Sequence, residues 1–281
     1  MKSALFTGAA VTLGLLLASV GSAQASTPTA PASTAAAPTP TPTARAHGIT
    51  KAGDAYSGWL SNTTTKTAAP AVMAPAATVE GIDVSSHQGN VNWASYWSAG
   101  KRFAYVKATE GTSYKNPYFA QQYNGSYNVG MIRGAYHFAL PNNSSGATQA
   151  NYFASNGGGW SRDGKTLPGT LDIEYNPYGA TCYGLSQAAM VNWVRDFLNT
   201  YKSRTGRDAV IYTNLDWWST CTGNSGAFNA TNPLWVARYA SAPGTLPGGW
   251  PFHTFWQYSS SPIDQDRFNG DQSRLVALAN G

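Results

Sequence analysis

The part of the sequence from Val79 onward alternates short apolar runs with longer helical patterns, and this alternation restricts the fold more than any other feature. Eight apolar runs are predicted to be strands: Gly81–Ser85, Phe103–Ala108, Met131–Phe138, Gly169–Tyr175, Ala209–Thr213, Leu234–Tyr239, Thr254–Tyr258 and Ile263–Phe268. Helices are predicted over Asn92–Ala99, from Pro117, over Gly146–Asn156 and over Ser186–Thr205. The strand–helix unit repeats about five times, and strands then follow with few helices between them.

Regular alternation of strands and helices implies a parallel sheet that is covered by helices. Eight strands in about 200 residues predict an α/β barrel of modified TIM type, with five βα units followed by three strands with few helices. The alternative is an open doubly wound sheet, which would need a glycine-rich phosphate turn after its first strand. The chain has Ser85–Gly89 (SSHQG) there, and neither a GxGxxG nor a P-loop pattern occurs. The barrel is therefore preferred, and no cofactor is expected.

The first 25 residues have the pattern of a secretory signal peptide. Lys2 supplies the charged start, Leu13–Val20 lies in an apolar run, and Ala23–Ala25 (AQA) fits a small-x-small cleavage site. An uncleaved anchor is the alternative, and the cleavage site disfavours it. The mature protein is therefore expected to be secreted and extracellular, with no membrane contact after signal cleavage.

Residues 26–78 are predicted to be an Ala/Thr/Pro-rich linker or pro-segment of low order. Ala, Thr and Pro make up nearly all of Ser26–Thr43, and such a stretch buries too little apolar surface to offset its chain entropy. Ile49–Leu60 differs because it carries large apolar side chains such as Trp59, and it is interpreted as a short docking segment or a pro-piece. The barrel is expected to span residues 79–281.

Charge and cysteine content exclude several classes of protein. The sequence has 18 Lys and Arg against 13 Asp and Glu, and its scattered basic residues do not form a nucleic-acid-binding patch. Cys182 and Cys221 are the only cysteines, and an even pair in an exported chain predicts one disulfide, with two free buried thiols as the alternative. The four His and two Cys lack HExxH and CxxC spacing, so no metal site is expected.

Acidic residues gather where the predicted strands end, on the face where barrels of this kind carry their chemistry. Asp83 lies in the first strand, Asp172 and Glu174 in the fourth, and Asp264 in the eighth. Asp172 and Glu174 are two residues apart, so both side chains point to one face, about 7 Å apart along the strand. Like charge and burial raise one pKa of such a pair, which leaves one carboxyl protonated and the other ionised. Glycoside cleavage needs this pairing, although a solvated acidic pair is the alternative.

Six ordered motifs stand out between Val79 and Gly281. They are Gly81–Gly89 (GIDVSSHQG) with Val91–Trp93 (VNW), Phe103–Gly111 (FAYVKATEG), Gly134–Phe138 (GAYHF), Leu171–Glu174 (LDIE), Phe255–Tyr258 (FWQY) and Ile263–Asp264 (ID). Together they resemble the lysozymes of glycoside hydrolase family 25. The resemblance implies the modified barrel and cleavage of the β-1,4 bond between N-acetylmuramic acid and N-acetylglucosamine. Bacterial peptidoglycan is then the expected partner of a monomeric enzyme, with no role for nucleic acid.

The resemblance also implies which residues act. It places catalytic carboxylates at Asp83, Asp172, Glu174 and Asp264. Glu174 is expected to protonate the leaving oxygen and then serve as base, while Asp172 stays anionic and orients the substrate's own 2-acetamido group. Asp264 is preferred to Asp266 because it directly follows the Ile of the family's pattern. Side chains near the strand ends are the candidates for binding sugar, although the aromatic ones could equally be core: Tyr136, His137, Tyr212, Arg238, Trp256 and Tyr258.

The same residues weigh against other activities. A chitinase of the DxxDxDxE type would need Asp at two positions that hold Thr170 and Leu167. A serine hydrolase would need a GxSxG motif, which does not occur, and a papain-like enzyme would need a free cysteine. A non-catalytic wall-binding barrel is the remaining alternative, and its signature would be loss of Asp172 or Glu174, both of which are present.

Overall fold

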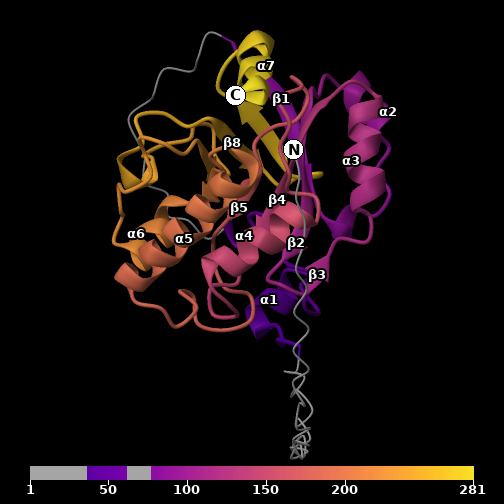
Figure 1. Cartoon of the computed structure of the whole chain (residues 1–281). Helices are drawn as coiled ribbons and strands as arrows, with labels where there is room; N and C mark the ends of the chain where they lie inside the picture. The colour runs from indigo at the N-terminus through magenta and orange to yellow at the C-terminus, as the bar shows by residue number, and fades with distance from the viewer. Residues whose placement is uncertain (1–36, 62–76) are drawn as a thin grey trace, which may run out of the picture. The chain divides into compact units, whose positions relative to one another are not determined.

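The computed structural model describes residues 37–61 and 77–281, and the predicted signal peptide lies outside them. Within these residues, nine strands form one sheet in the order β1-β9-β8-β7-β6-β5-β4-β2-β3. A further pairing of β1 with β2 closes eight of the strands into a barrel, and β3 extends it as an edge (Figure 1). The strands are β1 Val79–Val84, β2 Phe103–Glu110, β3 Tyr114–Lys115, β4 Ile132–Phe138, β5 Thr170–Asp172, β6 Val210–Thr213, β7 Leu234–Ala237, β8 Phe255–Ser259 and β9 Gln265–Phe268.

Helices separate the early strands, as the sequence predicts. Five βα units come first, and β7, β8 and β9 then follow with only a short 3₁₀ turn among them, which confirms the predicted barrel. The helices of the barrel are α2 Trp93–Ser98, α3 Phe119–Asn128, α4 Gly146–Ser155, α5 Gln187–Thr205, α6 Leu215–Thr222 and α7 Gln272–Asn280. The sequence analysis predicted the first four of these but not α6 or α7. Helix α5 begins after an N-cap Ser186 and ends at Gly206, which adopts the left-handed conformation.

The last strand reverses the direction of the sheet. Neighbouring strands from β1 through β2 and β4 to β8 are parallel, whereas β9 is antiparallel to both β8 and β1. Parallel neighbouring strands need a long crossover connection between them, usually one that contains a helix. The connection from β8 to β9 is too short for this, so β9 runs antiparallel to β8. The start of β9 therefore lies at the carboxyl ends of the other strands. This reversal brings Asp264 to the end of the barrel where Asp172 lies.

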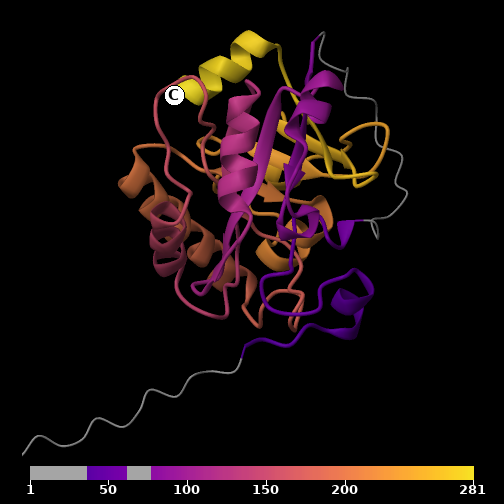
Figure 2. The same ribbon diagram turned by 90° about the vertical axis from the view of Figure 1, so that its right-hand side faces the viewer.

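Aromatic side chains fill the inside of the barrel. Tyr105, Tyr136, Tyr212, Trp235 and Phe255 belong to one buried cluster, in which the rings of Tyr105 and Trp235 stack with centroids 4.8 Å apart. Helix α7 joins this cluster from the amino ends of the strands, at the opposite end of the barrel from residues 37–61 (Figure 2). The other face of the strands packs against the surrounding helices, so the two faces of each strand have different environments.

Residues 37–61 fold against the barrel, so the prediction of low order is wrong for this part of the chain. Helix α1 (Pro42–Ala46) begins after Thr41, whose hydroxyl accepts a backbone N–H of its first turn. Ile49 and Trp59 are buried in the same apolar cluster as α5. Burial of these two side chains, together with hydrogen bonds from the segment's backbone to the barrel, stabilises an ordered conformation that the Ala/Thr/Pro-rich composition alone does not predict. The rest of the predicted linker, residues 26–36 and 62–76, lies outside the described residues.

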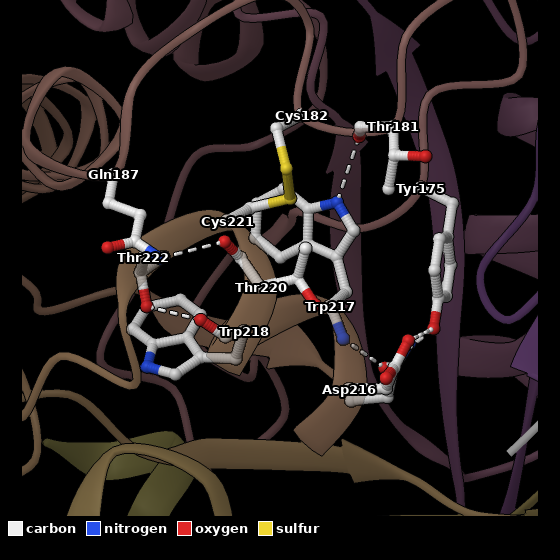
Figure 3. The surroundings of a disulfide bond; sticks show 11 residues. Tyr175, Thr181, Cys182, Gln187, Asp216, Trp217, Trp218, Thr220, Cys221 and Thr222 are labelled. Carbon is white, nitrogen blue, oxygen red and sulfur yellow. Dashed lines mark hydrogen bonds between the residues drawn. A yellow bond between two sulfur atoms is a disulfide. The ribbon is translucent and has the colours of Figure 1, made fainter.

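The predicted disulfide is present and joins two parts of the barrel's rim. Cys182, in the loop after β5, is bonded to Cys221 in α6, and Figure 3 shows the two cysteines with their neighbours. The hydroxyl of Tyr175 donates to Asp216 of the same helix at 2.6 Å. The disulfide and this hydrogen bond together fasten the chain that follows Glu174 to α6.

Candidate active site

Four predicted acids meet inside the carboxyl end of the barrel. Asp83 lies in β1, Asp172 ends β5, Glu174 follows two residues later, and Asp264 directly precedes β9. The first three side chains are fully buried, and Asp264 is only 6% exposed. Burial and then the charge of Asp83 raise the pKa of Asp264, and Asp264 in turn adds to the rise at Glu174. The four carboxyl groups therefore form one electrostatically coupled site.

Asp172 and Glu174 face the interior together, as their spacing predicts. Their carboxyl groups are close enough to shift each other's pKa, whereas Leu171 and Ile173 point outward into the apolar cluster beneath the helices. Asp172 Oδ1 and Glu174 Oε2 receive no hydrogen bond from another group in the described part of the chain. Each of these oxygens is therefore a buried acceptor that is left available to a proton or to a bound substrate.

The surroundings of this pair decide where its proton and its charge reside. Burial raises the pKa of both carboxyls well above their ordinary values. At Asp172 the hydroxyl of Ser57 and the ammonium group of Lys107 oppose that rise. At Glu174 the charge of Asp172 adds to it and outweighs the backbone N–H of Gly58, which opposes it. The negative charge is therefore more stable at Asp172 and the proton at Glu174.

A second carboxyl pair lies deeper in the barrel. Asp266, two residues beyond Asp264 in β9, hydrogen-bonds to Asp83 and accepts the indole N–H of Trp235 at 2.9 Å. Burial raises the pKa of Asp83 to about 7. Burial, followed by the charge of Asp83, raises that of Asp266. Asp266 is thus held inside the barrel by protein groups, whereas Asp264 lies closer to Glu174 at the rim.

Gln257 and Tyr239 are site residues that the sequence analysis missed. Gln257, in β8, donates its amide N–H to Asp83 Oδ2 at 2.8 Å, and its Oε1 accepts the hydroxyl of Tyr212 at 2.7 Å. The hydroxyl of Tyr239 donates to the same Oε1 at 3.1 Å. The sequence contains one signal that could have identified Gln257. It is two residues from Phe255 in the same strand, so both side chains lie on one face of the strand. Through Gln257, this network links Tyr212 to Asp83.

Lys107 is a further buried group that the sequence analysis did not assign to the site. Its ammonium nitrogen lies 2.5 Å from Glu110 Oε2, and the two side chains are 0% and 1% exposed. Glu110 also accepts the hydroxyl of Tyr178. The positive charge of Lys107 lowers the pKa of Asp172, so this ion pair contributes to the electrostatics of the catalytic candidates.

The prediction that His137 binds substrate is wrong, because β4 turns it away from the site. Tyr136 faces the interior, where burial and then the charge of Asp83 raise its pKa. The next residue must therefore face the helices. His137 Nδ1 lies 2.8 Å from the Thr109 hydroxyl, its Nε2 lies 2.9 Å from Gln149, and burial lowers its pKa to about 4. It is a neutral structural residue between the barrel and its helices.

Trp256 and Tyr258 are also on the wrong side of the barrel to bind substrate. Since Gln257 faces inward, both neighbours face outward. Trp256 donates its indole N–H to the Arg238 carbonyl at 2.8 Å, and the Tyr258 hydroxyl donates to Glu80 at 2.7 Å. Arg238 follows β7, where its guanidinium group donates to the carbonyl of Ala242, within its own loop, at 2.8 Å. Of the six predicted sugar-binding residues, Tyr136 and Tyr212 are thus the two that the structure places beside the acids.

The pKa of Asp83 leads to a prediction about stability. A carboxyl whose folded-state pKa is raised stabilises the fold fully below its unfolded pKa, near 4, and loses that contribution as pH rises through about 7. We therefore expect Asp83→Asn, which can still accept the Gln257 N–H, to raise the unfolding temperature relative to wild type at pH 7.5 but not at pH 3.5. Thermal unfolding followed by circular dichroism measures this difference. An equal shift at both pH values would contradict the assignment.

The described ranges, 37–61 and 77–281, contain no helix long and apolar enough to cross a membrane. In the same ranges, no group of three or more His, Cys, Asp or Glu is arranged to hold a metal ion.

Comparison with known proteins identifies the family. The family model for glycosyl hydrolases family 25 matches residues 82–267, and the chain belongs to this family. Lysozyme M1 of Streptomyces globisporus is 57% identical over 210 residues, which cover 72% of this chain and 71% of that protein. An N,O-diacetylmuramidase of Chalaropsis sp. is 53% identical over 211 residues, which cover 73% of this chain and all of that protein.

Solved structures agree with this assignment. The structure of a muramidase from Acremonium alcalophilum is 61% identical and covers 72% of this chain and 99% of its own, with a TM-score of 0.71. A lysozyme from Streptomyces coelicolor is 56% identical and covers 73% of this chain and 98% of its own, also with a TM-score of 0.71. These two solved chains are matched over almost their whole length, and the match covers about as many residues of this chain as lie in 77–281. A chain of that length is therefore sufficient to form the barrel.

Proposed function

We propose that this chain is a lysozyme that hydrolyses the β-1,4 bond between N-acetylmuramic acid and N-acetylglucosamine in bacterial peptidoglycan. The observation that carries the proposal is the buried Asp172–Glu174 pair, which lies at the carboxyl end of β5 in a family 25 barrel. Family membership and relatives that are lysozymes and muramidases support this substrate. The complete set of interior acids argues against a barrel that only binds the wall.

Glu174 is the proposed acid and base. Burial and the charge of Asp172 keep its carboxyl protonated, so it can donate a proton to the leaving glycosidic oxygen. After the bond breaks, the carboxylate of Glu174 can take a proton from the attacking water, which restores the acid for the next cycle. Both steps require the same side chain to lie within hydrogen-bond reach of the reacting oxygens.

Asp172 is proposed to remain anionic during the reaction. Its carboxylate would accept the N–H of the substrate's own 2-acetamido group, orient the acetamido oxygen towards the anomeric carbon and stabilise the positive charge that develops there. Asp83 and Asp264 would position the sugar and hold the charge of the pair in place. Tyr136 and Tyr212 would line the sugar site from the interior of the barrel.

Export completes the proposal, since peptidoglycan lies outside the cell membrane. The predicted signal peptide at residues 1–25 lies outside the described residues, so secretion rests on the sequence pattern. The Cys182–Cys221 disulfide fits an oxidising compartment, where such bonds persist. A monomeric, extracellular enzyme without a cofactor is the form that we propose.

A wall-clearing assay tests the activity. Residues 77–281, prepared alone, are expected to clear a suspension of purified peptidoglycan and to release fragments whose new reducing ends are N-acetylmuramic acid, as mass analysis would show. Walls with O-acetylated muramic acid are a second substrate, because two relatives are N,O-diacetylmuramidases. Binding to the walls without new reducing ends would show that the barrel is a binding module instead.

A further inference from the structure

We infer that residues 37–61, here called the inhibitory segment, occupy the position of the glycan and keep the full chain latent. This inference rests on the proposed function, because it takes the interior acids to be the catalytic site. It concerns a part of the chain that the family match, which begins at residue 82, leaves unassigned.

The inhibitory segment binds both proposed catalytic carboxyls directly. The hydroxyl of Ser57 donates to Asp172 Oδ2 at 2.9 Å, and the backbone N–H of Gly58 donates to Glu174 Oε1 at 2.6 Å. Ser57 is fully buried, so these bonds are formed away from water. Each carboxyl therefore has one oxygen already occupied by the segment, and a glycan that used these oxygens would first have to displace it.

The segment also uses the polar groups around the acids. The carbonyl of Ser57 accepts the amide N–H of Gln257 at 3.3 Å, and the carbonyl of Gly58 lies 3.2 Å from the Tyr239 hydroxyl, whose one proton it shares with Gln257 Oε1. A peptide group and the acetamido group of an N-acetylated sugar have the same N–H donor and C=O acceptor. The Ser57–Gly58 backbone therefore offers this site the hydrogen-bonding groups that such a sugar would offer.

Flanking residues anchor the segment on both sides of Ser57 and Gly58. On one side, the carbonyl of Gly53 accepts the Lys107 ammonium group at 3.0 Å, and its N–H donates to Glu110 at 3.0 Å. On the other side, Trp59 is 3% exposed and donates its indole N–H to the Tyr175 carbonyl at 3.0 Å. The ion pair inside the barrel thus serves as a receptor for the segment's backbone.

Gly58 is the position at which this fit is tightest. It has φ +81°, and an added Cβ atom would lie 2.3 Å from the Tyr239 hydroxyl, 2.4 Å from Gln257 Oε1 and 2.8 Å from the Tyr212 hydroxyl. A side chain of any size at this residue would therefore collide with the site. Gly48 provides a matched control in the same segment, since it has φ +82° and its added Cβ would lie 4.0 Å from the nearest atom, in His87.

The test compares one preparation of the full chain before and after the segment is separated from the barrel. A recognition sequence for a site-specific protease is placed within residues 62–76, and release of reducing ends from purified peptidoglycan is measured. If the segment fills the site in about 99 of 100 molecules, cutting followed by dilution raises the rate about a hundredfold. Gly58→Ala should raise the rate of the uncut chain towards the cut value, and Gly48→Ala, which shares the backbone strain, should leave it latent.

Each outcome separates this inference from the proposed function. Equal rates before and after cutting overturn the inference while leaving the lysozyme activity intact. Absence of activity in both the cut chain and residues 77–281 would contradict the proposed function. The inference about the segment is then tested by measuring whether the segment binds to the barrel. Saturable binding of a synthetic peptide of residues 37–61 to residues 77–281, weakened at least tenfold by Gly58→Ala, supports it; no binding, or equal binding of both peptides, overturns it.

Discussion

Glu174→Gln is expected to lower the kcat of the cut chain on peptidoglycan by about 10²- to 10⁴-fold, the range in which general acid–base catalysis contributes. The amide has almost the same shape as the carboxyl and can still accept the Gly58 N–H, so binding of the segment and of the glycan should change little. Only the transferable proton is lost. The measurement is the rate of reducing-end release at saturating substrate, together with KM.

Two comparisons make this result specific to the site. Asp208→Asn removes an acid whose partner is Lys202 on the surface, 2.8 Å away, and it should leave kcat unchanged. The unfolding temperature of Glu174→Gln should not fall, because the substitution removes a group that burial holds away from its ordinary pKa. Near wild-type turnover by Glu174→Gln would show that another residue is the acid.

Lys107→Met should lower the free energy of unfolding of the full chain by about 3–5 kcal/mol, as removal of one partner from a buried ion pair does. The substitution leaves Glu110, which is 1% exposed, without its positive partner in the interior. It also removes the donor to the Gly53 carbonyl in the inhibitory segment. Urea denaturation, followed by tryptophan fluorescence, measures the loss.

A double variant and a surface pair test the cause of that loss. Lys107→Met combined with Glu110→Gln removes the unpaired charge but keeps an acceptor for the Gly53 N–H, so it should recover at least half of the stability. Lys202→Met breaks an ion pair with Asp208 whose side chains are 54% and 30% exposed, and it should cost no more than about 1 kcal/mol. Similar losses from the Lys107 and Lys202 variants would mean that burial of the ion pair is unimportant.

The sequence predicted the barrel well because its strands differ clearly from its helices in periodicity. Runs such as Phe103–Ala108 and the long helix ending before Gly206 were located to within two residues. Helix α6 was missed because its eight residues follow β6 directly, with only Asn214 between them as a cap. Short helices of this kind depend on packing and capping more than on a long periodic pattern.

The site was predicted where the polar pattern fixes which residues of a strand face inward. In β5 the two acids alternate with Leu171 and Ile173, so only one orientation is reasonable. In β8 both faces carry large aromatic residues, Phe255 and Trp256, and the sequence gives no sign of which face is inside. In the structure, the hydrogen bond from Gln257 to Asp83 shows that Phe255 and Gln257 face the interior and that Trp256 faces outward. The predicted position of Trp256 is wrong because the sequence pattern allows either orientation of β8.

The fold of the inhibitory segment could not be predicted from its own residues. Its apolar side chains are few, and its most important hydrogen bonds use backbone groups, which every sequence has. The groups that receive it, Lys107 and Glu110, lie more than 50 residues away and come together only when β2 enters the barrel. Composition therefore indicated a linker, although the folded barrel provides a binding site for it.

The reversal of β9 has a practical consequence for how the protein can be joined to other molecules. Because β9 starts at the rim where the four acids meet, it carries the chain away from them, and α7 then ends at the amino ends of the strands (Figure 2). A tether, a label or a fused module attached after Gly281 would leave from the far end of the barrel. The cut enzyme could thus be immobilised through its carboxyl terminus with its polymer-binding end turned to the solution.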